Sequence, residues 1–207
     1  MKISMCLTAA ALAAGAGPAV AGINLVTNGS FEISDLDPGT AWIPMSAGNT
    51  AITGWTTFGG GIDYMGSIVA ASDGVRSIDL NNVTPGGGVE QTFATVAGWI
   101  YTVEFDLSAN MYGGPTPKVM EVSAAGQSEQ FEFDYVAAGA TAQDPAWERI
   151  SWSFIGNGSS ATLRFTGVST GVYGAEIDHV VVTGVAPTPG TAALLGLGGL
   201  VALRRRR

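Results

Sequence analysis

The stretch YTVEFDLSA, residues 101–109, decides the fold class of this chain. Large apolar side chains occupy every second position, and polar or charged side chains occupy most of the positions between them. The apolar set consists of Tyr101, Val103, Phe105 and Leu107. Because successive side chains of a β-strand point to opposite faces of a sheet, this alternation predicts a strand with one buried face and one solvated face.

The same alternation recurs downstream, between turn signals. It runs through EQFEFDY (129–135), ERISWSF (148–154) and ATLRFTG (161–167). Clusters of turn-forming residues lie at 37–39, 58–61, 84–88, 113–117 and 156–160. Helical periodicity is almost absent between residues 22 and 186. Many short strands joined by Gly-rich turns predict an all-β fold, an antiparallel two-sheet β-sandwich of about ten strands in the jelly-roll form.

The last predicted strand, AEIDHVVVTG (175–184), alternates less regularly, because three valines follow one another. A β-bulge near Asp178 would shift the register once and let apolar side chains on both sides of it face the core. Such a bulge would also be able to turn the Asp178 carboxylate towards a bound ion.

The first 21 residues have the layout of a secretory signal peptide. A single lysine precedes an apolar stretch that ends in the small-residue motif Ala19-Val20-Ala21. We therefore expect export and a mature chain that begins at Gly22. The one cysteine, Cys6, lies inside this segment. The mature chain is thus expected to have neither a disulfide nor a thiol nucleophile.

Residues 187–207 are interpreted as a sorting segment. Pro187-Thr188-Pro189 precedes an apolar run at 191–203, and the segment ends in Arg204, Arg205, Arg206 and Arg207. We expect the apolar run to form a hydrophobic helix of about 20 Å, short for a bilayer core of about 30 Å. The layout resembles bacterial PEP-CTERM sorting signals, with Thr in place of the middle Glu. This resemblance implies an exosortase-like processing enzyme and transient membrane association.

The expected mature domain, residues 22–186, is strongly acidic. Its four basic residues stand against 17 acidic ones, which gives a net charge of −13. Such a surface repels the phosphate backbone of nucleic acids and attracts cations. Solubility alone explains the charge equally well. The length is that of one domain with a full hydrophobic core.

Several segments of this domain resemble one known family. They are NLVTNGSFE (24–32), AITGWTTFGGGIDYMGS (51–67), DGVRSIDL (73–80), VEQTFATVAGWIYTVEFDLSAN (89–110), KVMEVSAAGQSEQFEFD (118–134) and YGAEIDHVVVTG (173–184). Together they look like the bacterial choice-of-anchor C domain, which is similar to a domain of plant cell-wall proteins, to galactose-binding-like jelly rolls and to carbohydrate-binding modules. The resemblance implies a jelly roll at the bacterial cell surface, outer envelope or extracellular matrix. It implies no established activity.

Carbohydrate-binding modules of this shape often carry a structural Ca²⁺ where the first and last strands meet. The matching positions are Glu32 and Asp178, and backbone carbonyls at 28–30 would complete the oxygen shell. The family's second Asp is replaced here by His179, which suits Ca²⁺ poorly. The resemblance therefore implies a calcium site at these two acids. The alternative is that both acids only cap strands at the surface.

No catalytic residue is predicted. His179 is the one histidine of the chain and lies among valines, and no G-x-S-x-G motif accompanies it. With one histidine and one cysteine, zinc clusters of these residues are excluded. Acids such as Glu129, Glu132 and Asp134 lie along one predicted strand, where a polar face explains them. A glycoside hydrolase is therefore the less favoured alternative.

Sugar binding needs aromatic platforms with polar neighbours. The candidates near loops or strand ends are Trp42, Tyr64, Tyr112 and Tyr173. Trp55 and Trp152 are assigned to the core instead. We expect an envelope-associated module without catalysis that binds extracellular or cell-wall polysaccharide. The open alternative is a structural matrix or coat protein with protein partners and no sugar site.

Overall fold

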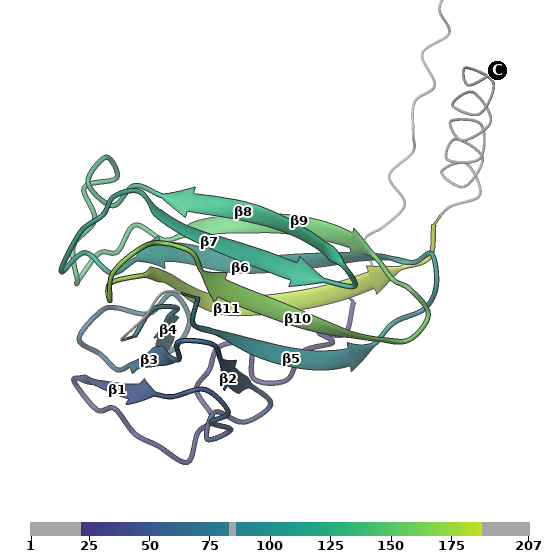
Figure 1. The fold of residues 1–207 in the computed structure, drawn as a ribbon, viewed down its shortest axis with the longest axis horizontal. Helices are drawn as coiled ribbons and strands as arrows, with labels where there is room; N and C mark the ends of the chain where they lie inside the picture. Colours follow the sequence, from purple (N-terminus) through teal and green to yellow (C-terminus); the bar gives the residue numbers. More distant parts are fainter. Residues whose placement is uncertain (1–21, 83–85, 188–207) are drawn as a thin grey trace, which may run out of the picture.

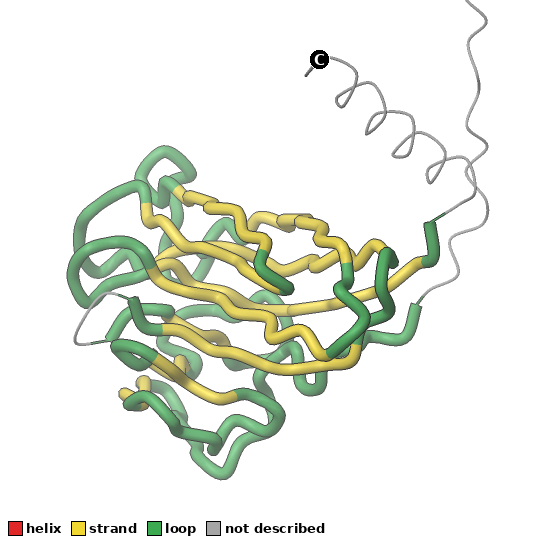
Figure 2. The backbone as a smooth tube through the Cα atoms, turned by 45° about the vertical axis from the view of Figure 1, so that its right-hand side comes forward, coloured by secondary structure: helices red, strands yellow, loops and turns green. Residues whose placement is uncertain are grey.

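The computed structural model describes residues 22–82 and 86–187, and all regular structure in this part of the chain is β-strand (Figure 2). The predicted signal peptide and, apart from Pro187, the predicted sorting segment lie outside the described residues. The strands are β1 (Trp42–Met45), β2 (Thr56–Phe58), β3 (Ile62–Met65), β4 (Ser77–Asp79), β5 (Gly88–Ala94), β6 (Ile100–Ala109), β7 (Lys118–Ala124), β8 (Gln127–Phe133), β9 (Glu148–Ile155), β10 (Ser160–Gly167) and β11 (Ala175–Val185).

These strands form two antiparallel sheets that pack face to face (Figure 1). One sheet has six strands in the order β1-β3-β4-β11-β6-β9, and the other has five in the order β2-β5-β10-β7-β8. The four short strands β1 to β4 gather at one end of the molecule, while β5 to β11 form its long body (Figure 1). The structure thus confirms the predicted antiparallel two-sheet sandwich.

The decisive stretch forms β6, between β11 and β9 in the six-stranded sheet. Its four large apolar side chains are all buried. Phe105 packs edge-to-face against Phe165 of β10, with ring centroids 5.1 Å apart, and so joins the two sheets. Trp55 lies against Phe31 and Phe165. Trp152 is also buried, so both tryptophans assigned to the core belong to it.

The last strand, β11, contains the predicted bulge. Its pairing with β6 changes register between Asp178 and Val181, and His179 within this interval has a φ of 49°. Ile177 before the bulge and Val180 after it are both buried. The bulge therefore lets the strand present apolar side chains to the core on both sides of the register change.

The outer face of the six-stranded sheet differs from the prediction of a solvated polar face. Five of its described polar side chains are fully buried: Ser77, Asp79, Ser108, Glu176 and Asp178. Hydrogen bonds tie Asp178 to loop 66–76 and Ser108 to loop 134–147. The prediction was wrong here because alternation tells which face a side chain joins, and not whether a loop covers that face.

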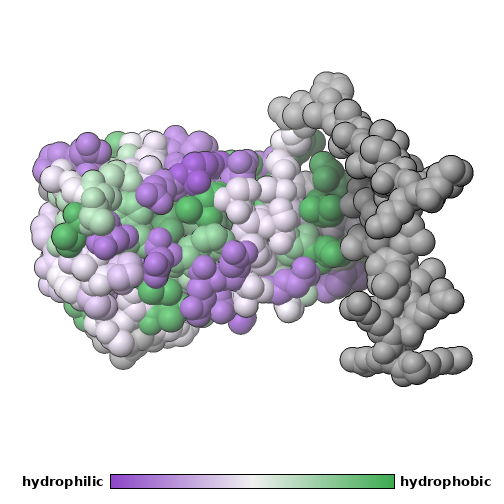
Figure 3. Space-filling view, turned by 90° about the horizontal axis from the view of Figure 1, so that it is seen from above, coloured by the Kyte–Doolittle hydropathy of each residue, from purple (hydrophilic) through white to green (hydrophobic). Residues whose placement is uncertain are grey.

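Within residues 22–82 and 86–187, no helix has the length and apolar character that crossing a membrane requires. Figure 3 shows one face of the molecule, where hydrophilic residues are spread widely and the hydrophobic areas are separate from one another. This view therefore presents no continuous apolar face.

Candidate ligand-binding site

A cavity of about 540 Å³ opens beside β1 and β3. Ten of the described residues line it, and they come from five separate parts of the chain. They include Trp42, Asp63, Met65, Asn110, Tyr112 and Tyr173. Three of these six are aromatic, and most of the others are polar. A cavity with large apolar surfaces and a few polar groups is typical of small-molecule and sugar sites.

One wall of the cavity comes from the β1–β3 pair. The antiparallel register places Trp42 opposite Met65 and Pro44 opposite Asp63. Directly paired residues point to the same face of a sheet, and so do residues two positions apart along a strand. All four side chains are therefore presented together, which explains how two short strands build one side of the cavity.

Another part of the lining comes from the loop after β6 and the loop before β11. These loops are neighbours because β6 and β11 pair along their length, and the Asn110 N–H donates to the carbonyl of Gly174 where the pairing ends. Tyr112 lies in the first loop and Tyr173 in the second. Gly113 approaches the Tyr173 ring so closely that a Cβ atom there would overlap the ring.

Lys118, at the start of β7, ties these two loops together. Its side chain is fully buried, and Nζ donates to the carbonyl oxygens of Gly113 and Tyr173, both at 2.6 Å. The ammonium also lies 5.9 Å from the centroid of the Tyr173 ring. Burial lowers the pKa of Lys118, and the negative charge of Asp79 opposes this effect. Lys118 therefore fixes the loops that carry two of the three aromatic side chains.

A polar layer lies behind the aromatic walls. Asp79 is fully buried, and its carboxylate accepts hydrogen bonds from the N–H groups of Asn81 and Gly174 and from Nδ2 of Asn110, at 2.8–2.9 Å. Burial raises the pKa of Asp79 to about 7, although these hydrogen bonds act in the opposite direction. Asn110 thus reaches from this layer into the lining of the cavity.

Among the described residues, Asp63 is the one acidic residue in the lining of the cavity. It pairs directly with Asp79 across the β3–β4 register. Its Oδ1 atom is buried and has no hydrogen-bond partner among the described residues. Burial raises the pKa of Asp63 to about 6, so at neutral pH the group is mostly ionised. The cavity therefore contains a carboxylate that no neighbouring donor compensates.

Of the four aromatic residues predicted to bind a ligand, the structure brings three together. Trp42, Tyr112 and Tyr173 line the cavity and are 50%, 54% and 37% exposed. Tyr64 is not among them. It is fully buried, and its hydroxyl donates to the carbonyl of Phe31 at 2.8 Å. Its assignment to a binding surface was wrong, because Tyr64 and the buried Ile62 share the inner face of β3.

Sequence reasoning missed the polar and charged members of the site. Asp63 alternates with buried neighbours in IDYM, a pattern that would have placed it on the outer face of β3. Lys118 is the one lysine between residues 22 and 186, and it follows a Pro-rich turn. Its burial depends on the loop around Tyr173, which is distant in sequence. No local pattern indicates that contact.

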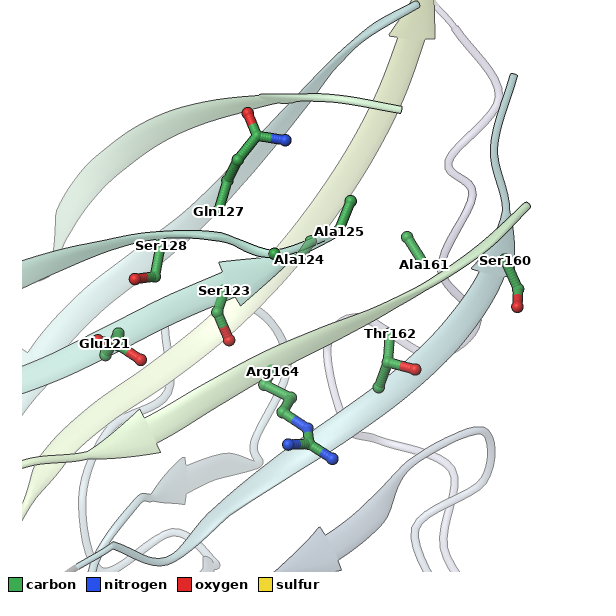
Figure 4. A pocket seen from close by; sticks show the side chains of 11 residues that line it. Glu121, Ser123, Ala124, Ala125, Gln127, Ser128, Ser160, Ala161, Thr162 and Arg164 are labelled. Atoms are coloured by element: carbon green, nitrogen blue, oxygen red, sulfur yellow. The ribbon is translucent and has the colours of Figure 1, made fainter. Parts of the chain in front are cut away.

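A second cavity, of about 440 Å³, lies on the outer face of the five-stranded sheet (Figure 4). Figure 4 shows polar and small side chains from β7, β8 and β10 around it, among them Ser123, Gln127, Thr162 and Arg164. Arg164 is held by Glu90 through a 2.6 Å ion pair. The lining includes no aromatic residue within the described part of the chain. The first cavity is therefore the better candidate for stacking a ring.

The two acids predicted to bind calcium both hold one loop. Glu32 Oε1 accepts the N–H groups of Val75 and Arg76, at 2.8 and 2.7 Å. Asp178 Oδ2 accepts the N–H and hydroxyl of Ser72 at 2.9 and 3.1 Å, and the neighbouring N–H of residue 73 at 2.8 Å. Both carboxylates thus anchor the chain between 72 and 76.

Two of the three backbone carbonyls that were expected to complete the shell also have partners. The carbonyl of Asn28 accepts from the Trp55 indole, and that of Gly29 accepts from the Val180 N–H. His179 Nδ1 lies 3.3 Å from a carboxylate oxygen of Asp106. Among the described residues, no three acidic, histidine or cysteine side chains form a group suited to a metal ion. Calcium would compete with N–H donors for these oxygens, and its binding remains a prediction.

Chelation tests that prediction. If Glu32 and Asp178 share a calcium ion, adding a chelator to the purified protein lowers the melting temperature, and excess calcium restores it. An ion at about a hundred times its Kd adds about 2.7 kcal/mol, and on the order of 5–10 °C in a chain of this size. Differential scanning fluorimetry measures the shift. An unchanged melting temperature would contradict the shared calcium ion. Anchoring the loop would then be the role of the two acids.

The sequence of this chain is similar to part of one curated protein. The curated protein halomucin, from Haloquadratum walsbyi, is 31% identical over 176 residues, which cover 82% of this chain. The chain spans only 2% of the length of halomucin.

Among solved structures, a Stig cyclase from Fischerella sp. TAU in complex with an indole compound is similar with a TM-score of 0.55 at 16% identity. The match covers 81% of this chain and all of that one. A family 35 carbohydrate binding module from Clostridium thermocellum is similar with a TM-score of 0.46 at 14% identity, over 69% of this chain and 97% of that one. At such identities the cyclase shares the fold, and nothing about function follows from it.

A family model described as "Protein of unknown function (DUF642)" matches residues 24–183. This match runs from the segment that contains the buried Phe31 to the end part of β11, and so includes both sheets and the aromatic cavity. The chain therefore belongs to the DUF642 family.

Proposed function

We propose that this chain is a module without catalytic activity that binds a polysaccharide in the cavity lined by Trp42, Tyr112 and Tyr173. The observation that carries the proposal is the convergence of these three side chains, from three distant parts of the sequence, on one cavity. Each is at least one third exposed, so a ligand can reach its ring.

Exposed aromatic rings suit sugars because the C–H face of a pyranose is apolar and its edges carry hydroxyl groups. Burying a ring face removes apolar surface from water at roughly 25 cal/mol per Å². The hydroxyl groups then need polar partners. Asn82, Asn110 and Asp63 line the same cavity and supply amide and carboxylate groups for them. The cavity thus offers both kinds of contact that a sugar ring uses.

The absence of catalysis is part of the proposal, and the lining of the cavity supports it. Glycoside hydrolysis by the usual mechanisms needs two carboxyl groups on either side of the scissile bond. In the described part of the chain, Asp63 is the one carboxylate in the lining, because its cross-strand neighbour Asp79 is fully buried and outside the lining. His179 is outside the lining and lies beside Asp106.

The proposal includes export to the cell surface, outer envelope or extracellular matrix. It is supported by the signal-peptide layout of residues 1–21, the sorting-signal layout of 187–207 and the high acidity of the domain between them. Under this proposal an exosortase-like enzyme processes the C-terminal segment after transient membrane association. The similarity to a protein named halomucin is consistent with a place outside the cell.

Affinity electrophoresis tests the binding site. We expect the purified protein to be retarded in a gel that contains the right soluble polysaccharide. Replacing Trp42→Ala or Tyr112→Ala should weaken the retardation by about tenfold in Kd, which corresponds to roughly 1.4 kcal/mol of lost stacking. Thr162→Ala in the second, polar cavity is the matched control and should leave the retardation unchanged.

Two results would contradict this proposal. Retardation that is lost with Thr162→Ala and kept with Trp42→Ala would move the site to the five-stranded sheet. Free migration through a broad panel of polysaccharides would favour the alternative of a matrix or coat protein with protein partners. A screen for proteins that bind the purified chain would then be the next step.

A further inference from the structure

The charged groups that line the aromatic cavity are all negative among the described residues. Its described lining contains the carboxylate of Asp63 and no lysine, arginine or histidine. The buried carboxyl group of Asp79 is the direct cross-strand neighbour of Asp63. A ligand that enters this cavity therefore approaches a negative wall.

No basic group of the described chain forms an ion pair or a hydrogen bond with Asp63. Arg76 pairs with Asp37 at 2.6 Å, Arg149 with Asp106 at 3.0 Å, and Arg164 with Glu90 at 2.6 Å. Lys118 donates to two backbone carbonyls, and His179 lies beside Asp106. The two carbonyls are neutral, so Lys118 keeps its positive charge, and that charge acts on the neighbouring Asp79. Among the described residues, Asp63 is therefore the carboxylate of this cavity that has no basic partner.

The aromatic side chains of the cavity also favour a positively charged ligand. The face of an aromatic ring carries negative electrostatic potential and attracts an ammonium group, with tryptophan the strongest and tyrosine next. One tryptophan and two tyrosines meet the Asp63 carboxylate in this cavity. Several aromatic faces with a carboxylate are the combination that recognises organic ammonium ions.

From this combination we infer that the cavity selects a glycan that carries free, protonated amino groups, and that Asp63 is the residue that determines this specificity. The inference rests on the proposed function, because it names the class of polysaccharide for the same site. The Asp63 carboxylate supplies the counter-charge, and the three aromatic side chains hold the sugar rings. Glycans with carboxylate or sulfate groups are excluded by repulsion from the same wall.

Isothermal titration with three sets of short, soluble oligosaccharides at neutral pH tests the inference. Glucosamine oligomers carry amines, N-acetylglucosamine oligomers are the neutral counterparts with the same backbone, and galacturonic acid oligomers are negatively charged. We expect the glucosamine oligomers to bind about tenfold tighter than the neutral ones. Added salt should reduce this preference, because exposed charges are screened over about 10 Å at 0.1 M. Galacturonic acid oligomers should not bind measurably.

The variant Asp63→Asn keeps the shape of the side chain and removes its charge. We expect it to abolish the preference for amines, so that glucosamine and N-acetylglucosamine oligomers bind this variant with similar affinity. Trp42→Ala should weaken the binding of both sets together. If Asp63→Asn fails to fold, the preference of the unmodified protein and its salt dependence still decide the question.

Each outcome bears on one proposal or on both. Equal affinity for amine and neutral oligomers, or a preference for amines that survives in Asp63→Asn, would overturn the inference and leave polysaccharide binding in place. Tighter binding of galacturonic acid oligomers would overturn it as well. Failure of every oligomer and every polysaccharide of the electrophoresis panel to bind would overturn the proposed function itself.

Discussion

Lowering the pH from 8 to 5 should raise the melting temperature of the protein by on the order of 10 °C. The expected cause is a row of carboxyl groups on the covered face of the six-stranded sheet. Asp63, Asp79 and Glu176 are direct neighbours across β3, β4 and β11. Asp79 and Glu176 are fully buried. Thermal unfolding followed by circular dichroism, with a chelator present throughout, measures the effect.

The direction of this pH dependence follows from the raised pKa values of these carboxyl groups. Burial raises the pKa of Asp79 to about 7 and that of Asp63 to about 6, from an ordinary value of 3.8. A carboxyl group with a raised pKa binds its proton more tightly in the folded chain. Its contribution to stability is therefore fully present below about pH 4 and is lost as the pH rises through 6 to 7. Between pH 5 and 8, Asp79 alone accounts for roughly 2–3 kcal/mol at 1.36 kcal/mol per pKa unit, because this window covers only the upper part of the interval from 3.8 to about 7.

Glu176 gives the sharpest test of this explanation. Neither of its carboxylate oxygens has a hydrogen-bond partner among the described residues. Burial raises its pKa well above the ordinary value, and the charges of Asp79 and Asp178 add to the effect. Replacing Glu176→Gln removes the charge at nearly constant shape. We expect this variant to be more stable than the original protein at pH 8 and similar to it at pH 5.

A matched control removes the same charge from the surface. Glu129 is exposed on the edge strand β8, and Glu129→Gln should leave the pH dependence as it is. If Glu176→Gln were less stable than the original protein at pH 8, the Glu176 carboxylate would have to be ionised and stabilised in the fold. A stability that does not change between pH 5 and 8 would contradict the whole explanation.

The fold was predictable from the sequence because alternation is a local signal. In residues 101–109 it fixed both the strand and its inward face, and the irregularity near Asp178 was enough to predict the bulge. What the alternation does not contain is the path of the loops. Residues such as Glu176 sit on the polar face of their strand, and only the coverage by distant loops makes them buried.

The candidate site was predictable in part for the same reason. Glycine-flanked loops around Tyr112 and Tyr173 indicate exposure, and both side chains are exposed. That these loops meet each other and Trp42 depends on the pairing of β6 with β11 and of β1 with β3. These pairings join positions far apart in the chain, so the cavity and its charge became visible only in the structure.

The second large effect is expected from Lys118→Met, which keeps the apolar stem of the side chain and removes the ammonium group. The carbonyls of Gly113 and Tyr173 then lose a donor inside the protein. Hydrogen bonds to charged groups contribute about 1.5–3 kcal/mol each, and part of this is offset because the ammonium no longer has to be buried. We expect a net loss of about 3 kcal/mol, or a melting temperature lower by about 6–12 °C.

Lys118→Met should also abolish polysaccharide binding at temperatures where the variant is fully folded, because Lys118 holds the loops that carry Tyr112 and Tyr173. Arg164→Met is the matched control, since it removes an equal charge from a half-exposed side chain on the neighbouring strand. This control should change the free energy of unfolding by less than about 1 kcal/mol, and the melting temperature correspondingly little. A Lys118→Met variant that is destabilised yet binds as tightly as the original protein would show that the ammonium supports the fold without positioning the site. Normal stability and normal binding would contradict both roles, because two buried carbonyls without a donor should lower the unfolding temperature.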